Sequence, residues 1–189
     1  MNLFQLIMLL SAGVIFYLFF KQILSEDFHQ EKSKKSDISP NRLEELLEIA
    51  KESLKNRNYL EAQKALQSAL ILAPDHPDIL RMLGVSFIGM NNYLDAKKTY
   101  QKLLEINPND DLAHSSLANV LHQLGEDEEA IKHHKIAIEL DRSYAPHYFN
   151  YANTLYDLRD FKEAKEAYRR AFELDPSLKE AKEMFEKLN

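Results

Sequence analysis

The sequence predicts an all-α protein built as an array of helix pairs. A 34-residue pattern starts at Leu43 and runs four times without a gap, and a fixed period of this size is the signature of repeat architectures. Within each period, apolar residues lie three or four apart, as they do on one face of a helix. The 189 residues include only 4 Gly, which suits helices better than hairpins.

The composition excludes several classes of function. Net charge is −6, and an acidic chain lacks the clustered Lys and Arg that phosphate contacts need, so we expect no nucleic-acid partner. The absence of Cys excludes disulfides, thiolate metal sites and a cysteine nucleophile. There is no Gly-rich phosphate loop, nucleophile elbow or recognisable pair of catalytic acids. We therefore predict no enzyme, no catalytic residues and no cofactor.

The first 24 residues predict a transmembrane anchor. Residues 3–20 carry no charge, and a helix of that length covers about 27 Å, close to the hydrocarbon core of a bilayer. Lys21 follows, where its ammonium group can reach the membrane surface. A cleaved signal peptide is the alternative, but no basic residue precedes the apolar run and Phe19-Phe20 occupy its end.

Basic residues after the span predict its orientation. Lys21, Lys32, Lys34 and Lys35 follow the span and none precedes it, so the repeats should face the cytoplasm, with the periplasm or a lumen as the alternative. Residues 25–41 are polar and mixed in charge, and we interpret them as a flexible linker. Within the linker, Ser39 and Pro40 suit the cap and first residue of a helix.

Each repeat is predicted to hold a helix A followed by a helix B. The repeats are 43–76, 77–110, 111–144 and 145–178. Two positions are always small, which lets helices A and B approach closely. The eighth position holds Ala50, Gly84, Ala118 and Ala152, and the twentieth holds Ala62, Ala96, Ala130 and Ala164.

Position 27, with Ala69, Leu103, Ala137 and Ala171, is where helix B should meet the next helix A. Larger residues should fill the space around these positions: position 24 holds Leu66, Tyr100, His134 and Tyr168, and position 30 holds Leu72, Ile106, Leu140 and Leu174. Pro74, Pro108 and Pro176 should end helix B, because proline disfavours the α conformation in the preceding residue. Residues 179–189 continue the pattern as a helix that caps the last repeat.

This pattern resembles the tetratricopeptide repeat, and the resemblance covers residues 43–178 four times in register. It implies a superhelix over residues 42–189 whose concave groove is lined by the A helices. It also implies a non-catalytic role in binding peptides or helices of other proteins. The clamp that some such domains use for acidic C-termini is not expected here. At the corresponding places this chain has Leu47, Lys51, Met82, Leu112 and Ser116, of which only Lys51 is basic.

Nine residues are predicted to line the groove. They are Arg81, Met82, Val85, Asn119, His122, Phe149, Asn150, Asn153 and Tyr156. Asn119 and Asn153 occupy the ninth position of successive repeats, and a side-chain amide can pair with the backbone of an extended peptide. The aromatic and aliphatic members would supply anchor contacts. Their alternative interpretation is ordinary, half-exposed helix residues.

The third repeat departs from the pattern. It carries His114, Asp127, His134 and Arg142 where the other repeats mostly have apolar residues or Pro, so we predict that it is the least well packed unit. None of the 7 His are spaced four apart on one helix, and we predict no metal site.

The predicted function is that of a membrane-anchored scaffold that binds a protein or peptide in its groove. One alternative is an assembly factor or chaperone for exported proteins on the periplasmic or lumenal side. Another is a homo-oligomer that associates through its repeats or its membrane span, where Ser11, Ala12 and Gly13 are small.

Overall fold

The computed structural model describes residues 41–188. The predicted anchor at 1–24, the linker up to residue 40 and the expected helix start at Ser39-Pro40 lie outside the described residues. Between residues 41 and 188, no helix combines the length and the apolarity that a membrane crossing requires.

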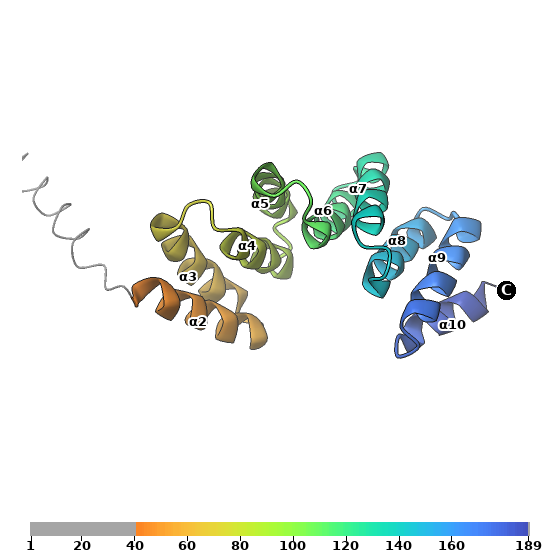
Figure 1. The fold of residues 1–189 in the computed structure, drawn as a ribbon, viewed down its shortest axis with the longest axis horizontal. Helices are drawn as coiled ribbons and strands as arrows, with labels where there is room; N and C mark the ends of the chain where they lie inside the picture. Colours follow the sequence, from red (N-terminus) through yellow and green to blue (C-terminus); the bar gives the residue numbers. More distant parts are fainter. Residues whose placement is uncertain (1–40, 189) are drawn as a thin grey trace, which may run out of the picture. The chain divides into compact units, whose positions relative to one another are not determined.

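The described part of the chain consists of helices and turns, without strands (Figure 1). Each sequence repeat contains two helices, and one further helix follows the fourth, which confirms the predicted all-α array. The helices are α2 (Arg42–Lys55), α3 (Tyr59–Leu72), α4 (Pro77–Gly89), α5 (Tyr93–Ile106), α6 (Asp111–Gln123), α7 (Asp127–Leu140), α8 (Ala145–Asp157), α9 (Phe161–Leu174) and α10 (Lys179–Lys187).

The turn between helices A and B has the same geometry in all four repeats. Position 15 has a positive φ each time, at Arg57, Asn91, Gly125 and Arg159. The N–H of the next residue then donates to the carbonyl five residues back, as in Asn92 to Phe87 at 2.8 Å. This bond closes the Schellman motif that ends helix A. The residue that donates it is also the N-cap of helix B.

The small residues lie where the sequence predicted. The seven alanines at positions 8 and 20 are 0% exposed, and Gly84 is buried. A Cβ atom at Gly84 would lie 2.6 Å from Cζ of Tyr100, too close for any real contact. The Tyr100 ring therefore requires glycine at this position. Positions 24 and 27 are also buried in every repeat, which confirms their predicted place between helices.

One prediction about helix B needs correction, and another needs to be narrowed. At position 30, Ile106 and Leu140 are each 39% exposed, so this position does not fill the core in every repeat. Helix B ends before Pro74, Pro108 and Pro176 as predicted, and the residue before each Pro lies outside the α conformation. Proline is not required for this end, because the α7 helix also ends at the same position, Leu140, although Arg142 stands where the other repeats have Pro. Its last turn closes with the bond from Asp141 N–H to the Ala137 carbonyl that its counterparts also make.

The buried apolar residues form two clusters within the described chain. One extends from 46 to 130 and the other from 151 to 181. Between them, polar groups link the third and fourth repeats. Nε2 of the fully buried His134 lies 3.0 Å from Oγ1 of Thr154, and Nε2 of His147 lies 2.8 Å from a carboxylate oxygen of Asp111.

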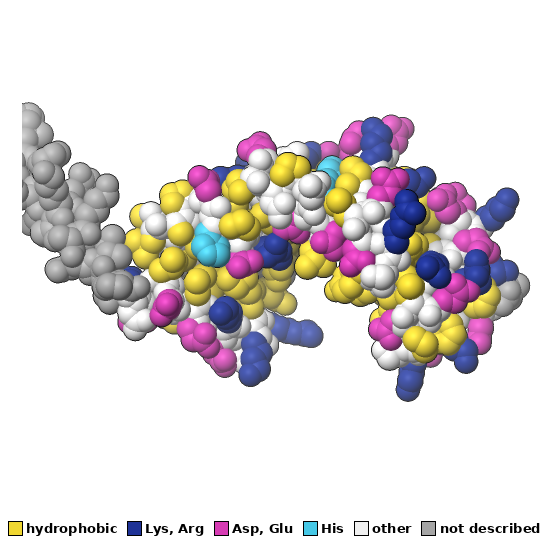
Figure 2. All heavy atoms as spheres, viewed as in Figure 1, with side chains coloured by type: hydrophobic (Ala, Val, Ile, Leu, Met, Phe, Trp, Pro, Cys, Tyr) yellow, Lys and Arg dark blue, Asp and Glu magenta, His cyan; other side chains and the backbone are white. Residues whose placement is uncertain are grey.

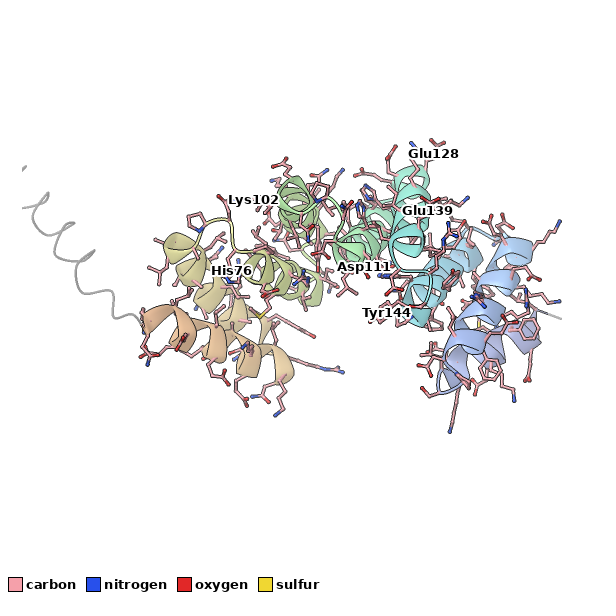
Figure 3. All side chains as sticks on the ribbon, in the orientation of Figure 1. His76, Lys102, Asp111, Glu128, Glu139 and Tyr144 are labelled. Carbon is pink, nitrogen blue, oxygen red and sulfur yellow. The ribbon has the colours of Figure 1, made fainter. Side chains whose placement is uncertain are left out.

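Polar contacts also link the earlier repeats, and the outer surface mixes both charges. Lys97 pairs with Glu126 at 2.5 Å. Lys102 of α5, labelled in Figure 3, donates to the carbonyl of Pro74, before α4, at 3.0 Å. On the face seen in Figure 2, acidic, basic and hydrophobic side chains alternate. No single sign of charge dominates that face.

Candidate functional site

The nine predicted groove residues lie on three A helices, α4, α6 and α8. Hydrogen bonds and ion pairs join these helices along the side that carries the nine residues. Asn150 donates to Oγ of Ser115 at 3.3 Å, and Nε2 of His122 lies 3.2 Å from a carboxylate oxygen of Asp157. Arg81 of α4 pairs with Asp110, the N-cap of α6, at 2.5 Å. We call the surface formed by the nine residues the helix A surface.

The apolar members differ in how far they are free to bind. Val85 is 42% exposed, whereas Met82 is half-buried and packs against the first core cluster. Phe149 is also half-buried, with its ring 5.9 Å from that of Tyr168. Tyr156 lies 5.4 Å from the Phe161 ring. Its hydroxyl accepts a hydrogen bond from Lys187 at 3.2 Å.

The two asparagines at the ninth position are not equivalent. Oδ1 of Asn153 accepts a hydrogen bond from the Tyr168 hydroxyl at 2.6 Å. In the third repeat the residue that corresponds to Tyr168 is His134, which bonds to Thr154 instead. The half-buried Asn119 makes no side-chain hydrogen bond with the described residues. Its donors and its acceptor are therefore all available to a peptide backbone.

The charged members of the helix A surface are already paired. Partial burial lowers the pKa of Arg81, but hydrogen bonds to Asp110 and Asp78 outweigh this effect and the pKa lies above its usual value. His122 behaves in the same way. Burial lowers its pKa, and hydrogen bonds to Asp127 and Asp157 raise it above the usual value. Arg81 is therefore neutralised by its own neighbours and cannot serve as a free cation for an acidic ligand.

Three hollows in the described chain do not coincide with this surface. They measure about 640, 360 and 480 Å³, and none of the nine candidates lines them. The second lies among α7, α8 and α9, with Tyr148 and Tyr151 among its lining residues. The third lies among α5, α6 and α7 beside His114 and His133. The first lies between α2 and α3.

The structure brings together histidines that are far apart in sequence. Nδ1 of His114 lies 2.8 Å from Nδ1 of His133, and Nε2 of His114 lies 3.0 Å from the Pro108 carbonyl. Since a carbonyl only accepts, Nε2 of His114 carries the proton, and His133 donates to Nδ1 of His114. A spacing of 19 residues on two helices gave no signal for this pair. Residues 41–188 contain no group of three or more side chains that could hold a metal ion.

Family comparisons agree with the repeat pattern. Two sequence-family models, both described as tetratricopeptide repeat, match residues 53–120 and 111–177. No curated protein is significantly similar to the chain in sequence.

Several solved structures share the fold. TTC0263, a tetratricopeptide repeat protein of Thermus thermophilus, superposes with a TM-score of 0.70 at 16% identity, over 94% of this chain and 95% of that chain. MamA (41-end) of Desulfovibrio magneticus RS-1 has a TM-score of 0.65 at 19% identity, over 78% and 93%. The first such domain of Spaghetti (RPAP3), bound to the HSP90 peptide SRMEEVD, has a TM-score of 0.56 at 25% identity, over 59% and 89%.

Proposed function

Because this chain belongs to the tetratricopeptide repeat family, whose models match residues 53–177, we propose that it is a non-catalytic scaffold that binds a protein or peptide on its helix A surface. The observation that carries the proposal is Asn119. Its side chain is half-buried and has no hydrogen bond within the described chain. A half-buried amide without a protein partner is well suited to pair with an extended backbone.

The charge of this surface restricts the class of peptide. The similar RPAP3 domain is bound to SRMEEVD, a peptide with three acidic residues among its last four. In this chain Arg81 is held between Asp78 and Asp110, and Asp157 adds a further negative charge beside His122. We infer that the ligand is a neutral or basic extended peptide with an apolar anchor that contacts Phe149 or Val85.

The proposed cellular setting comes from the sequence. Residues 1–24 would anchor the scaffold in a membrane, which would raise its effective concentration near a partner in the same membrane. The lysines that follow the span favour a cytoplasmic repeat domain. A reporter fused after Asn189 that is active only on the opposite side would overturn this orientation.

The test is crosslinking and capture with the full-length, membrane-embedded chain. We expect Asn119→Ala/Phe149→Ala to lose the partners that the unaltered chain captures, because it removes the free amide and an aromatic contact. The matched control is Leu60→Ala/Gln67→Ala, which truncates an exposed apolar residue and an exposed amide on α3.

Circular dichroism should show unchanged helix content in both variants. If all three proteins captured the same partners, the helix A surface would not be the binding site.

A further inference from the structure

Two cations of this chain lie at one end of the helix A surface. Lys187 of α10 donates to the Tyr156 hydroxyl at 3.2 Å, and its ammonium nitrogen lies 5.5 Å from the centre of the Tyr156 ring. His122 of α6 reaches the next residue of α8, with Nε2 3.2 Å from a carboxylate oxygen of Asp157. Tyr156 and Asp157 therefore each contact a basic side chain that comes from another helix.

His122 is charged in this arrangement. Its Nδ1 lies 2.6 Å from a carboxylate oxygen of Asp127, while its Nε2 faces Asp157. A carboxylate only accepts hydrogen bonds, so both ring nitrogens carry protons while both bonds hold. Asp157 is thus bonded to a positively charged donor of this chain.

Lys187 belongs to the same row of residues as the two asparagines of the helix A surface. Counted on from the fourth repeat, it is the ninth residue of α10, and Asn119 and Asn153 are the ninth of their repeats. The described chain has five contacts between a cation and an aromatic ring, and this one alone involves a residue of the helix A surface. Lys187 is exposed and pairs with no carboxylate between residues 41 and 188, so it can leave Tyr156 without breaking an ion pair.

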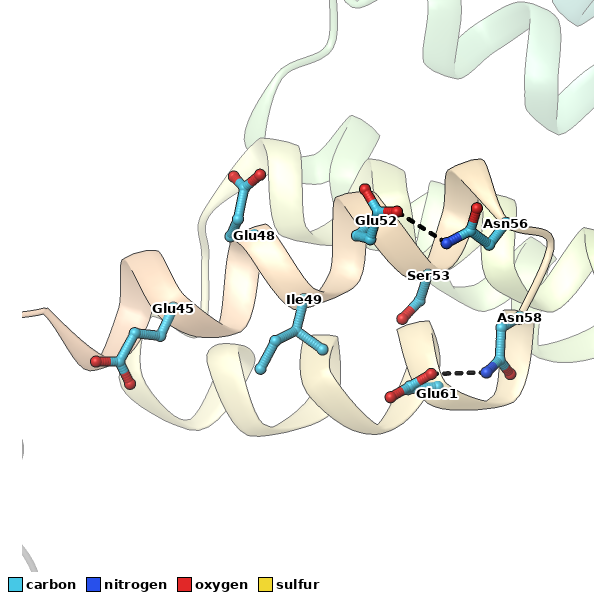
Figure 4. A pocket seen from close by; sticks show the side chains of 8 residues that line it. All are labelled: Glu45, Glu48, Ile49, Glu52, Ser53, Asn56, Asn58 and Glu61. Atoms are coloured by element: carbon cyan, nitrogen blue, oxygen red, sulfur yellow. Dashed lines mark hydrogen bonds between the residues drawn. The ribbon is translucent and has the colours of Figure 1, made fainter.

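An aromatic ring beside an exposed carboxylate is a combination that recognises cationic side chains. The ring face attracts an ammonium or guanidinium group, and the carboxylate adds a charge-assisted hydrogen bond. Asp157 is 61% exposed, and its second oxygen makes no bond with the described residues. The hollow between α2 and α3, drawn in Figure 4, has four glutamates in its lining but no aromatic side chain, so it lacks this combination.

We propose that Tyr156 and Asp157 form a subsite for a lysine or arginine side chain of the bound peptide, and that Lys187 fills this subsite in the free protein. The cation of the peptide takes the place of the Lys187 ammonium on the Tyr156 ring and bonds to the second oxygen of Asp157. Lys187 therefore competes with basic ligands and lowers their affinity. This inference rests on the function proposed for the helix A surface and names a side chain that the peptide presents there.

The test uses three mixtures of biotinylated decapeptides and the full-length chain in a neutral detergent. Nine positions of each peptide are randomised over uncharged residues, and the fifth is lysine, glutamate or norleucine, which is an uncharged analogue of lysine. Capture at increasing peptide concentration gives an apparent dissociation constant for each mixture. We expect the lysine mixture to bind about threefold more tightly than the norleucine mixture, and the glutamate mixture to bind more weakly than both.

Variants assign this preference to the subsite. Lys187→Ala should raise the preference for lysine about threefold further, because the internal cation no longer competes. Lys182→Ala is the matched control, since it removes another exposed cation from the same helix, and it should leave the preference unchanged. Tyr156→Leu and Asp157→Asn should each reduce the preference, whereas Glu128→Gln at an exposed site of α7 should not.

The outcomes separate the subsite from the surface that contains it. Equal binding of the lysine and norleucine mixtures, or an equal change in Lys187→Ala and Lys182→Ala, would overturn the subsite and leave the helix A surface in place. Tightest binding of the glutamate mixture, lost in Lys187→Ala, would make Lys187 a contact for acidic side chains and would also overturn it. Asn119→Ala/Phe149→Ala should weaken binding of every mixture. Unchanged binding by that variant, or no binding by the unaltered chain, would contradict the function proposed for the surface and the subsite with it.

Discussion

At the residue scale, position 15 of each repeat has a left-handed backbone, and only the third repeat places glycine there. Arg57 and Arg159 adopt this conformation at φ of 57° and 64°. A residue with a Cβ atom is destabilised by about 1 kcal/mol or more in the left-handed region, whereas glycine is not. This destabilisation is tolerated because only three residues separate the two helices, and they must both close the Schellman motif and start helix B.

Replacing these residues should change stability in opposite directions. We expect Arg57→Gly and Arg159→Gly to raise the free energy of unfolding by up to about 1 kcal/mol each, and Gly125→Ala to lower it by about 1 kcal/mol. Urea denaturation measures both effects. Arg142→Gly is the control, because Arg142 lies in a turn without a positive φ. Equal stabilisation by Arg142→Gly would mean that the left-handed turn is not the cause.

Sequence reasoning predicts the small positions of this fold and most of its buried ones, but not the exposure of position 30 or the state of the polar groups. The small residue at Gly84 could be predicted because a fixed period marks where helices approach, and the Tyr100 ring confirms it. The difference between Asn119 and Asn153 could not be predicted. It depends on whether the side chain packed beside each asparagine is a tyrosine that donates a hydrogen bond or a histidine that bonds elsewhere.

At the element scale, the contact between α7 and α8 includes a buried polar pair. It lies between the two apolar clusters, and His134 of α7 bonds there to Thr154 of α8, while His147 of α8 bonds to Asp111 of α6 beside it. The sequence predicted a weak third repeat from residue types alone. The structure adds that His114 and His134 are buried, at 7% and 0% exposure, so these departures form part of the packing.

Hydrogen exchange tests the stability of this unit. We expect amides in residues 111–144 to exchange faster than those of the second and fourth repeats, because fewer apolar contacts hold the unit to its neighbour. Exchange measured by mass spectrometry on the full chain gives the comparison directly. Slower exchange in 111–144 than in 77–110 would show that the buried histidines stabilise the array as well as apolar residues do.

At the scale of the whole molecule, buried histidines link stability to pH. Burial is the main cause that lowers the pKa of His134, and the nearby charges of His122, His147 and His133 lower it further, to about 3. Thr154 and Tyr151, its other neighbours, provide no negative charge. In the unfolded chain a histidine titrates near a pKa of about 6.5, so below that pH the unfolded state takes up a proton that folded His134 refuses. The contribution of neutral His134 to the free energy of unfolding is present above about pH 6.5 and is lost as pH falls toward about 3.

Two other histidines modify this dependence. Burial and the neighbouring His114 lower the pKa of His133, which adds in the same direction. The pKa of His122 is raised, so its contribution is present at low pH and is lost as pH rises through the folded value. The pKa values of two histidines are lowered and that of one is raised, so the effect of the two should prevail. We therefore expect a lower unfolding temperature at about pH 5 than at about pH 7.5.

The pH dependence can be assigned with one substitution. His134→Leu introduces the residue type that Leu66 provides at the same position of the first repeat. Below about pH 6.5, the free energy of unfolding of this variant should fall less steeply with pH than that of the unaltered chain. The two slopes should differ by about 1.4 kcal/mol per pH unit, the value for one proton. Chemical denaturation at several pH values measures the slope. An unchanged slope would assign the pH dependence to other groups.

The turn inside each repeat also decides how the array responds to a stretching force. One residue both closes the Schellman motif of helix A and caps helix B, so the two helices of a repeat are joined by a stiff corner. Under a stretching force, the contacts between repeats should therefore separate before the helices within a repeat do. The contact between α7 and α8 should separate at the lowest force. The array would then extend at the contacts between repeats while each helix pair stays rigid, and each contact would have its own stiffness.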